Sequence, residues 1–289
     1  MKVIDAIGAA AVWVFRFTTG AVGSALEDFG RFCVEEIKVF QWLMVTLRNW
    51  GGYSWNRLTG RPHGRAYEAR ETLDQMVSVG VNSLPVALIT AMFTGMVLAL
   101  QTGLTLESKM AGVSQYLGGM VSVSMLRELG PVLTALIVTG RVGSAMAAEI
   151  GTMKVTEQID ALETLATSPL RYLVVPRLIA LAVMMPILTV FSDAIGVMGG
   201  YWVARVRFGQ PASMYIENAQ MMVGMSDLFS GLTKTFFFGI IIVTVSCYKG
   251  FNTSGGAEGV GKATTSAVVV SSIAILVADY FLTAAMSVF

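Results

Sequence analysis

Charged side chains inside otherwise apolar stretches of sequence are the residues with the most chemistry to offer. Arg127 and Glu128 are neighbours in one such stretch, Lys234 and Asp279 each lie in another, and Asp193 lies in a fourth. An ionisable group is costly to bury in hydrocarbon and therefore marks a functional site by default. Two interpretations stay open: the five charges neutralise one another as a structural network, or they form a polar site in an apolar cavity.

The stretches that carry these charges are long enough to cross a membrane. The chain of 289 residues is 54% hydrophobic and only 13% charged, whereas soluble domains have about 25% charged residues. A helix needs roughly 20 apolar residues to cross the hydrocarbon core. The sequence therefore predicts an all-α membrane protein with five transmembrane helices, at residues 81–104, 117–140, 178–204, 227–248 and 264–289.

Helical geometry places the five charges at similar depths. At a rise of about 1.5 Å per residue, Arg127 and Glu128 lie about 15 Å from the outer end of their helix, and the other three lie about 11 to 17 Å deep. Such a layer suits an amphiphile with a charged head better than a small ion, because no span has closely spaced ion ligands. We add Gln101 of the first span to these candidate substrate-binding residues.

The composition argues against several other classes of protein. A net charge of +1 provides no field that would attract nucleic acid. Two distant cysteines and one histidine cannot build a zinc site or a catalytic triad, so we expect no enzyme activity, metal or cofactor. Residues 256–263 nearly match a phosphate-binding loop, but Ala263 replaces its Ser or Thr and a membrane span, not a β-strand, precedes it. We interpret these glycines as a tight turn before the fifth span.

Lysine and arginine residues are divided unevenly between the two sides of the predicted helices. With the N-terminus inside, fifteen lie on the cytoplasmic side and three on the periplasmic side. The positive-inside rule therefore favours five spans in a bacterial inner membrane, with a cytoplasmic N-terminus and a periplasmic C-terminus.

Residues 1–80 are expected to form amphipathic interfacial helices ahead of the five-span domain at residues 81–289. Charged and apolar positions alternate at helical spacing in residues 32–50, with Trp42 and Trp50 suited to the membrane interface. Residues 1–25 are expected to lie on the inner leaflet, and a cleaved signal peptide is the alternative. Residues 65–79 are predicted to be a charged helical lead-in to the first span.

The predicted cytoplasmic loop at residues 141–177 contains an amphipathic helix. Its apolar side chains recur at helical spacing: Val155, Ile159, Leu162 and Ala166. Its acidic side chains lie on another face: Glu157, Asp160 and Glu163. An acidic face is poorly suited to anionic lipid, so we expect a cytoplasmic protein to contact this helix, which Pro169 would end.

Two runs of this sequence resemble the MlaE-type permeases, the membrane subunits of lipid-transporting ABC systems that work with MCE-domain proteins. The first is LRELGPVLTALIVTGRVGSAMAAEIGTMKVTEQIDALETLATSPLRYLVVPR, which begins at Leu126. The second is EGVGKATTSAVVVSSIAILVADYFLTAAM, which begins at Glu258. The likeness extends over residues 65–289.

The resemblance implies a homodimer that encloses an outward lipid pocket. The charges that match the family's polar membrane positions are Arg127, Glu128, Lys234 and Asp279. The helix within residues 150–167 corresponds to the coupling helix that docks on a separate ATPase subunit. The residues that we expect to make this contact are Lys154, Glu157, Ile159, Asp160, Leu162 and Glu163.

The function implied by the resemblance is movement of phospholipid between the inner membrane and a periplasmic MCE-type carrier, which helps to maintain outer-membrane lipid asymmetry. The chain itself would be non-catalytic, and a small cytoplasmic accessory subunit would complete the complex. The alternative is a self-sufficient, proton-coupled secondary transporter that uses Glu128 and Asp279 as a proton relay. An inverted repeat would favour the alternative, and we find none in the sequence.

Overall fold

The computed structural model describes residues 65–109, 116–165 and 167–287, and within these ranges the chain is helical without a β-strand. Five segments of this part are long and apolar enough to cross a membrane: Glu71–Glu107, Leu117–Val155, Leu170–Phe208, Met225–Phe251 and Gly256–Met286. The predicted all-α membrane fold with five spans is therefore confirmed. The expectations for residues 1–64 lie outside the described residues, and the division into residues 1–80 and 81–289 stays a prediction.

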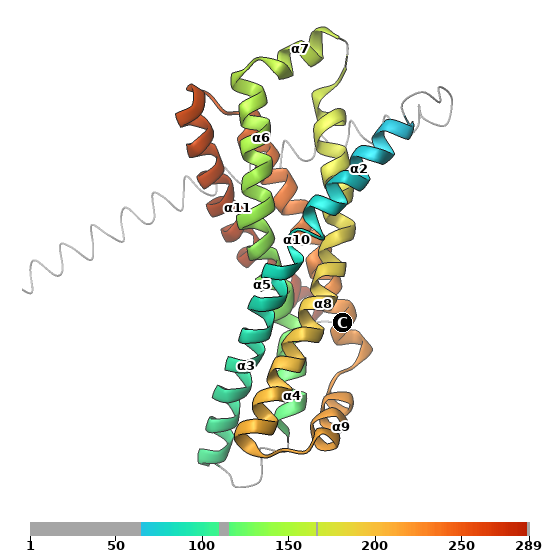
Figure 1. Ribbon diagram of the computed structural model, residues 1–289, viewed down its shortest axis with the longest axis vertical. Coiled ribbons are helices and arrows are strands. Elements are labelled where there is room, and N and C mark those ends of the chain that lie inside the picture. The colour runs from blue at the N-terminus through green and yellow to red at the C-terminus, as the bar shows by residue number, and fades with distance from the viewer. Residues whose placement is uncertain (1–64, 110–115, 166, 288–289) are drawn as a thin grey trace, which may run out of the picture. The chain divides into compact units, whose positions relative to one another are not determined.

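The described residues form α-helices, which are labelled in Figure 1, and short π-helical turns within the second and third segments. The α-helices are α2 (Arg65–Val79), α3 (Leu84–Lys109), α4 (Leu117–Ser124), α5 (Gly130–Val138), α6 (Ser144–Val155), α7 (Gln158–Thr164), α8 (Val175–Phe208), α9 (Ala212–Met222), α10 (Met225–Phe251) and α11 (Gly256–Met286). The π-helical turns are η2 (Met125–Leu129), η3 (Thr139–Gly143) and η4 (Leu170–Val174). Helix α2 has the bounds of the helix predicted at residues 65–79, and from Glu71 onward it forms part of the first membrane-crossing segment.

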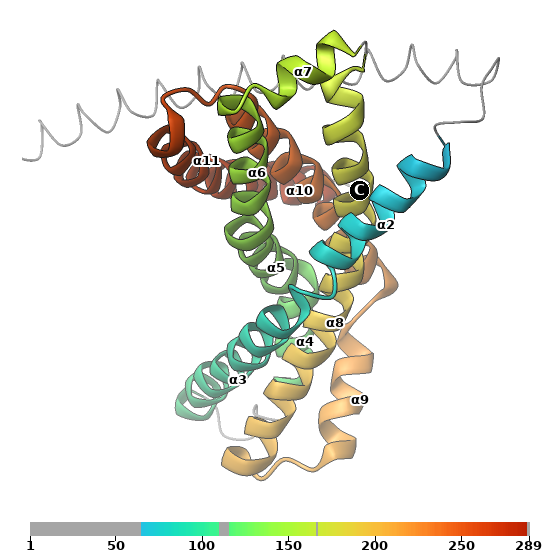
Figure 2. The same ribbon diagram turned by 45° about the horizontal axis from the view of Figure 1, so that its top comes forward.

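Helix α8 is the central element and packs against α2, α3 and α10 (Figures 1 and 2). Its contact with α3 is close because glycines line it. A methyl group on Gly95 would overlap the backbone carbonyl of Gly196, and one on Gly199 would overlap that of Met92. Small residues at this spacing, such as Gly196 and Gly200, predict a close approach of membrane helices. The structure places this approach within one chain.

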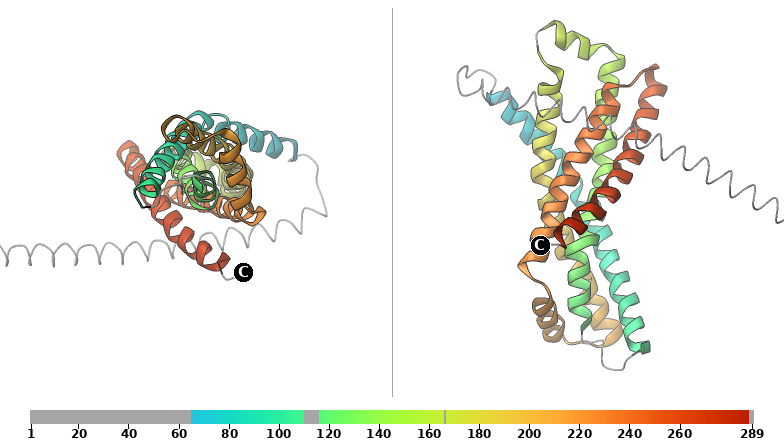
Figure 3. Two further views of the ribbon diagram at one scale, coloured as in Figure 1. Left: turned by 90° about the horizontal axis from the view of Figure 1, so that it is seen from below. Right: turned by 180° about the vertical axis from the view of Figure 1, so that it is seen from behind.

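The start of α10 and the end of α11 meet part-way along the bundle (Figure 3). The hydroxyl group of Ser230 donates to the sulfur of Met286 at 3.1 Å, which joins these two helix ends. Helix α10 also contacts η2, and both α10 and α11 pack against α6. The packing therefore brings the fourth and fifth spans against the irregular part of the second.

The second and third membrane helices are longer than predicted. The second does not end at residue 140 but continues through η3 and α6 to Val155, and the third begins at Leu170. Helix therefore extends into both ends of the predicted loop at residues 141–177, and residues 156–169 connect the two helical segments; the position of the loop outside the membrane stays a prediction. Arg141 does not end the helix, because its guanidinium donates to the hydroxyl group of Ser83 at 2.9 Å and α6 packs on α10 and α11.

The amphipathic helix predicted from residue 155 onward is broken near its start. Glu157 has a φ angle of 60°, in the left-handed region, and it separates α6 from α7. Val155 and Ile159 therefore belong to different helices rather than to one apolar stripe. Helix α7 ends at Thr164, before the predicted stop, and Pro169 directly precedes η4.

The glycine-rich segment before the fifth span is mostly helical. Gly255 and Gly256 have positive φ angles of 88° and 65°, and they make the turn between α10 and α11. Helix α11 already begins at Gly256 and includes Lys262. The predicted tight turn is therefore confined to the first of these glycines, and the remainder forms the first turns of α11.

Candidate functional site

The candidate site is built around η2, the π-helical turn that carries both Arg127 and Glu128. Such turns occur frequently at functional sites. Pro131 follows η2 and has no amide hydrogen, so it cannot donate to the carbonyl group of Arg127 four residues earlier. The ammonium group of Lys234 donates to that carbonyl instead, at 3.1 Å. The irregular backbone of the second span thus provides an attachment point for α10.

Lys234 is the centre of the site, and its side chain is only 1% exposed. Its Nζ atom lies 2.7 Å from Oε1 of Glu128 and 3.1 Å from Oδ1 of Asp279. The ammonium group thus makes one hydrogen bond, to the Arg127 carbonyl, and two ion pairs, with Glu128 and Asp279. Lys234 therefore joins η2, α10 and α11, and its ammonium group is buried among these partners.

Arg127 forms the exposed part of the site. Its Nε atom donates to Oδ1 of Asp227 at 2.5 Å, and the arginine side chain is 56% exposed while the aspartate is 4% exposed. Oδ2 of Asp227 accepts the amide hydrogen of Gly224 at 2.8 Å and so caps the start of α10. The sequence prediction missed Asp227 as a site residue. Its signal is an acidic residue three positions after a glycine at a helix start.

Glu128 and Thr283 complete the cluster. The Thr283 hydroxyl group donates to Oε1 of Glu128 at 3.2 Å, and the Glu128 side chain is 41% exposed. Thr283 was also absent from the prediction, although it lies four residues after Asp279 and hence on the same face of α11. Four of the predicted charges are therefore brought together by three spans: Arg127, Glu128, Lys234 and Asp279.

The structure does not bring Asp193 or Gln101 into this cluster. Asp193 of α8 is buried against Gly130, where a methyl group would overlap its Oδ1 atom. That oxygen has no hydrogen-bond partner among the described residues. Gln101 is exposed on α3. The hydroxyl group of Thr105 donates to the backbone carbonyl of Gln101 in the same helix. Depth along a helix is predictable from sequence, but the direction of a side chain around the helix is not.

The residues predicted to contact an ATPase all lie at the α6–α7 junction or in α7. The ammonium group of Lys154 lies 2.9 Å from Oδ1 of Asp160 and joins the two helices. The other four differ in burial: Ile159 is buried, Leu162 is half-buried, and Glu157 and Glu163 are exposed. The apolar side chains thus anchor α7 while acidic groups remain at the surface.

A buried arginine, Arg177, lies at the start of α8, just after the connecting residues 156–169. The sequence prediction missed this residue. Nη2 of Arg177 lies 2.8 Å from Oε2 of Glu149, and Nη1 donates to the carbonyl group of Leu173 at 2.7 Å. The Arg177 side chain is 3% exposed. This pair connects α6 to α8 on either side of the connecting residues 156–169.

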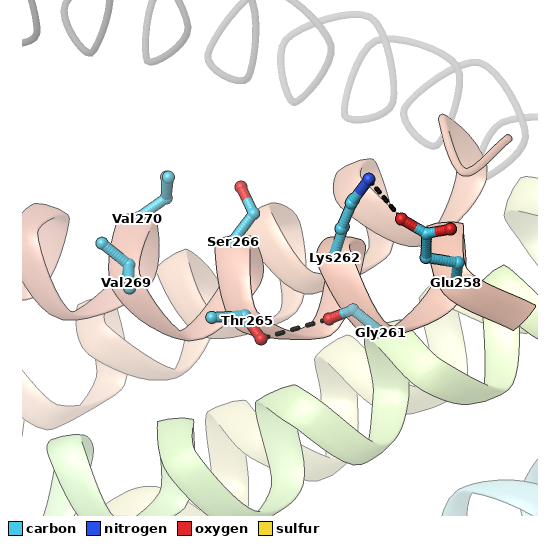
Figure 4. A pocket seen from close by; sticks show the side chains of 7 residues that line it. All are labelled: Glu258, Gly261, Lys262, Thr265, Ser266, Val269 and Val270. Carbon is cyan, nitrogen blue, oxygen red and sulfur yellow. Dashed lines mark hydrogen bonds and ion pairs between the residues drawn. The ribbon is translucent and has the colours of Figure 1, made fainter. Parts of the chain in front are cut away.

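A shallow pocket lies on the first turns of α11 (Figure 4). Its lining consists of Glu258, Gly261, Lys262, Thr265, Ser266, Val269 and Val270. All of these belong to one helix, so the pocket is an open hollow on its surface, and its lysine is 76% exposed and lies 2.7 Å from Glu258. It is separate from the charge cluster. Among the described residues there is also no group of three acidic, histidine or cysteine side chains that could hold a metal ion.

Five membrane-crossing segments, three of which share a charge cluster, define a multi-pass helical membrane protein with a polar site among its helices, a feature typical of substrate and ion pathways. The family Permease MlaE matches residues 72–285. The chain belongs to this family of ABC transporter permeases, as the resemblance in its sequence predicts.

Relatives of known name agree with this assignment. A probable ABC transporter permease protein of Rickettsia typhi is 49% identical over 211 residues, which cover 72% of this chain and 80% of that protein. One from a Synechocystis species is 47% identical over 213 residues, or 74% and 80% of the two chains. The chloroplast protein trigalactosyldiacylglycerol 1 of Arabidopsis thaliana is 39% identical over 213 residues, or 74% and 60%.

Proposed function

We propose that this permease moves phospholipid between the bacterial inner membrane and a periplasmic carrier of the MCE type, and so helps to maintain the lipid asymmetry of the outer membrane. The chain is the non-catalytic membrane subunit. A separate cytoplasmic subunit hydrolyses ATP, two copies of the permease enclose the lipid pocket, and a small cytoplasmic subunit completes the complex.

The observation that carries this proposal is the exposed guanidinium of Arg127 at a charge cluster among apolar helices. Arg127 uses only Nε for Asp227, and more than half of its side chain is accessible. Guanidinium is well matched to phosphate oxygens because it can donate two parallel hydrogen bonds. Met225 and Phe229, which flank Asp227 on α10, are 74% and 65% exposed. Cation and apolar surface together suit a lipid with an anionic phosphate and acyl chains.

The name of the Arabidopsis relative supports a lipid substrate, because it contains the name of a galactolipid. It does not specify a phospholipid. The choice of phosphate over sugar as the recognised group rests on Arg127 and on the resemblance to permeases of MCE systems.

We place the N-terminal side of the first span in the cytoplasm and the C-terminus in the periplasm. The support is the uneven division of lysine and arginine residues, with fifteen on the proposed cytoplasmic side and three on the periplasmic side. The odd number of membrane-crossing segments then places the two ends on opposite sides. In this orientation α7 lies in the cytoplasm, where its exposed acidic residues Glu157, Asp160 and Glu163 contact the ATPase. Helix α9 then lies on the periplasmic side, toward the carrier.

The test is purification of the permease from native membranes with its neighbours untagged, followed by lipid mass spectrometry. We expect an ATPase subunit, an MCE-domain protein and phospholipid to co-purify. Arg127→Ala should keep the protein partners and lose the phospholipid, whereas Arg207→Ala, at an exposed position near the end of α8, should lose neither. A permease that purifies alone and responds to a proton gradient would instead support the secondary transporter.

A further inference from the structure

The charge cluster around Lys234 contains more acidic than basic side chains. Two cations face three carboxylates: Arg127 and Lys234 against Asp227, Glu128 and Asp279. Glu128 and Asp279 share the single ammonium group of Lys234. An anionic ligand would add to this imbalance, whereas a ligand that carries its own cation would reduce it.

Two consecutive residues of η2 leave one available group of each sign. The terminal nitrogens Nη1 and Nη2 of Arg127 donate to none of the described residues, because the ion pair with Asp227 uses only Nε. Glu128 uses Oε1 for both Lys234 and Thr283, and its Oε2 accepts no hydrogen bond from the part of the chain that the structure describes. A partly exposed guanidinium therefore lies next in sequence to a partly exposed carboxylate oxygen.

Both groups are held by ion-pair partners on α10. Arg127 is held by Asp227 and Glu128 by Lys234, and these partners are seven residues apart on one helix, or about 10 Å along its axis. A headgroup whose phosphate and amine are two carbons apart, hydrogen-bonded at each end at about 2.8 Å, spans a similar length. The length of such a headgroup thus matches the separation of the two partners along α10.

We propose that Glu128 selects the headgroup: Arg127 binds the lipid phosphate, Oε2 of Glu128 accepts a hydrogen bond from a primary amine, and the permease prefers zwitterionic aminophospholipid to anionic lipid. This inference rests on the proposed function. An ammonium group forms a charge-assisted hydrogen bond with a carboxylate. A choline group has the positive charge but no hydrogen to donate, so we expect the preference for a choline lipid to lie between those for aminophospholipid and anionic lipid. An anionic glycerol headgroup keeps the phosphate contact with Arg127 but has no cation to offer to Glu128.

The test uses the assembled permease and ATPase complex in vesicles of one common lipid mixture. Each vesicle preparation contains a trace of labelled phosphatidylethanolamine, phosphatidylcholine or phosphatidylglycerol, and the ATP-dependent extraction of the label is measured. We expect the wild-type complex to prefer phosphatidylethanolamine over phosphatidylglycerol by about tenfold, the contribution of one charge-assisted hydrogen bond at a half-exposed site.

Three variants separate selectivity from folding. Glu128→Gln keeps an oxygen acceptor for Lys234 but removes the charge, so the preference should fall to less than about twofold. Glu128→Asp keeps the charge and should retain a preference. Glu107→Gln, at an exposed carboxylate near the end of α3, should leave the wild-type ratio unchanged.

Equal extraction of the three lipids by the wild-type complex would overturn the inference and leave the proposed function intact. A ratio of phosphatidylethanolamine to phosphatidylglycerol extraction that is unchanged in Glu128→Gln would also overturn the inference. If that variant does not accumulate, the ratio measured for the wild-type complex decides whether the inference holds. ATP-dependent extraction of no phospholipid at all would refute the proposed function. Inhibition by free glycerophosphoethanolamine as strong as by the lipid itself would assign the site to a soluble zwitterion and contradict a lipid headgroup site.

Discussion

Replacement of Lys234 by methionine should destabilise the permease, whereas replacement of Arg127 by alanine should not. Methionine keeps much of the apolar stem of lysine and removes the ammonium group. Glu128 and Asp279, which bond to the same Nζ atom at 2.7 Å and 3.1 Å, would then face each other without a cation. The Arg127 carbonyl, which Pro131 cannot satisfy, would also lose its donor.

The expected cost follows from burial. Removing one partner of a buried ion pair costs about 3 to 5 kcal/mol. Lys234 is 1% exposed, but Asp279 is 19% and Glu128 is 41% exposed, so water stabilises part of the orphaned charge. We therefore expect about 3 kcal/mol, the lower end of that range. Arg127 is 56% exposed, and its partner Asp227, although only 4% exposed, keeps the hydrogen bond from the Gly224 amide, so we expect the loss of this pair to cost no more than about 1 kcal/mol.

The assay is membrane abundance together with thermal unfolding of the solubilised protein. Lys234→Met should lower both, and Arg127→Ala should keep both while losing bound phospholipid. A triple variant, K234M with E128Q and D279N, should recover most of the lost stability, because no unpaired charge then remains at the centre of the cluster. Wild-type stability of Lys234→Met, or no recovery in the triple variant, would refute the conclusion that Lys234 holds η2, α10 and α11 together.

The remaining predictions concern the two ends of the bundle. Glu157→Lys with Asp160→Lys should weaken docking of the ATPase by reversing the acidic surface of α7; co-purification at wild-type stoichiometry would contradict this. Arg177→Met should leave the ATPase bound but reduce lipid transport per ATP hydrolysed, since the buried pair between α6 and α8 is lost, and an unchanged ratio would show that the pair has no part in coupling. In a background without native cysteines, an impermeant thiol reagent should label Lys109→Cys and not Lys154→Cys in intact spheroplasts. The reverse pattern would overturn the proposed orientation.

Which charges share a depth could be predicted from the sequence, but which of them meet could not. Depth depends on the rise per residue, and the estimate placed Arg127, Glu128, Lys234 and Asp279 in the layer where they meet. Asp193 has a similar depth but points to Gly130. The rotation of α8 that sends it there depends on packing, including the glycine contacts with α3, and no periodicity in the sequence encodes this rotation.

The irregular turns and the helix ends were also beyond sequence reasoning. The π-helical geometry of η2 changes the direction in which Arg127 and Glu128 point, and its only local sign is Pro131. The second and third membrane helices extend to Val155 and from Leu170 because packing on α10 and α11 and the Arg141 hydrogen bond support residues that look like a polar loop. Such contacts join residues that are far apart in the chain.

The most direct test of phospholipid transport is ATP-driven transfer of a labelled phospholipid between vesicles containing the permease with its ATPase and a soluble MCE-domain carrier. We predict transfer that requires ATP, continues when the proton gradient is collapsed, and is lost in Arg127→Ala at wild-type abundance. Transfer that proceeds without ATP, stops when the proton gradient is collapsed, or is unaffected by Arg127→Ala would contradict the account.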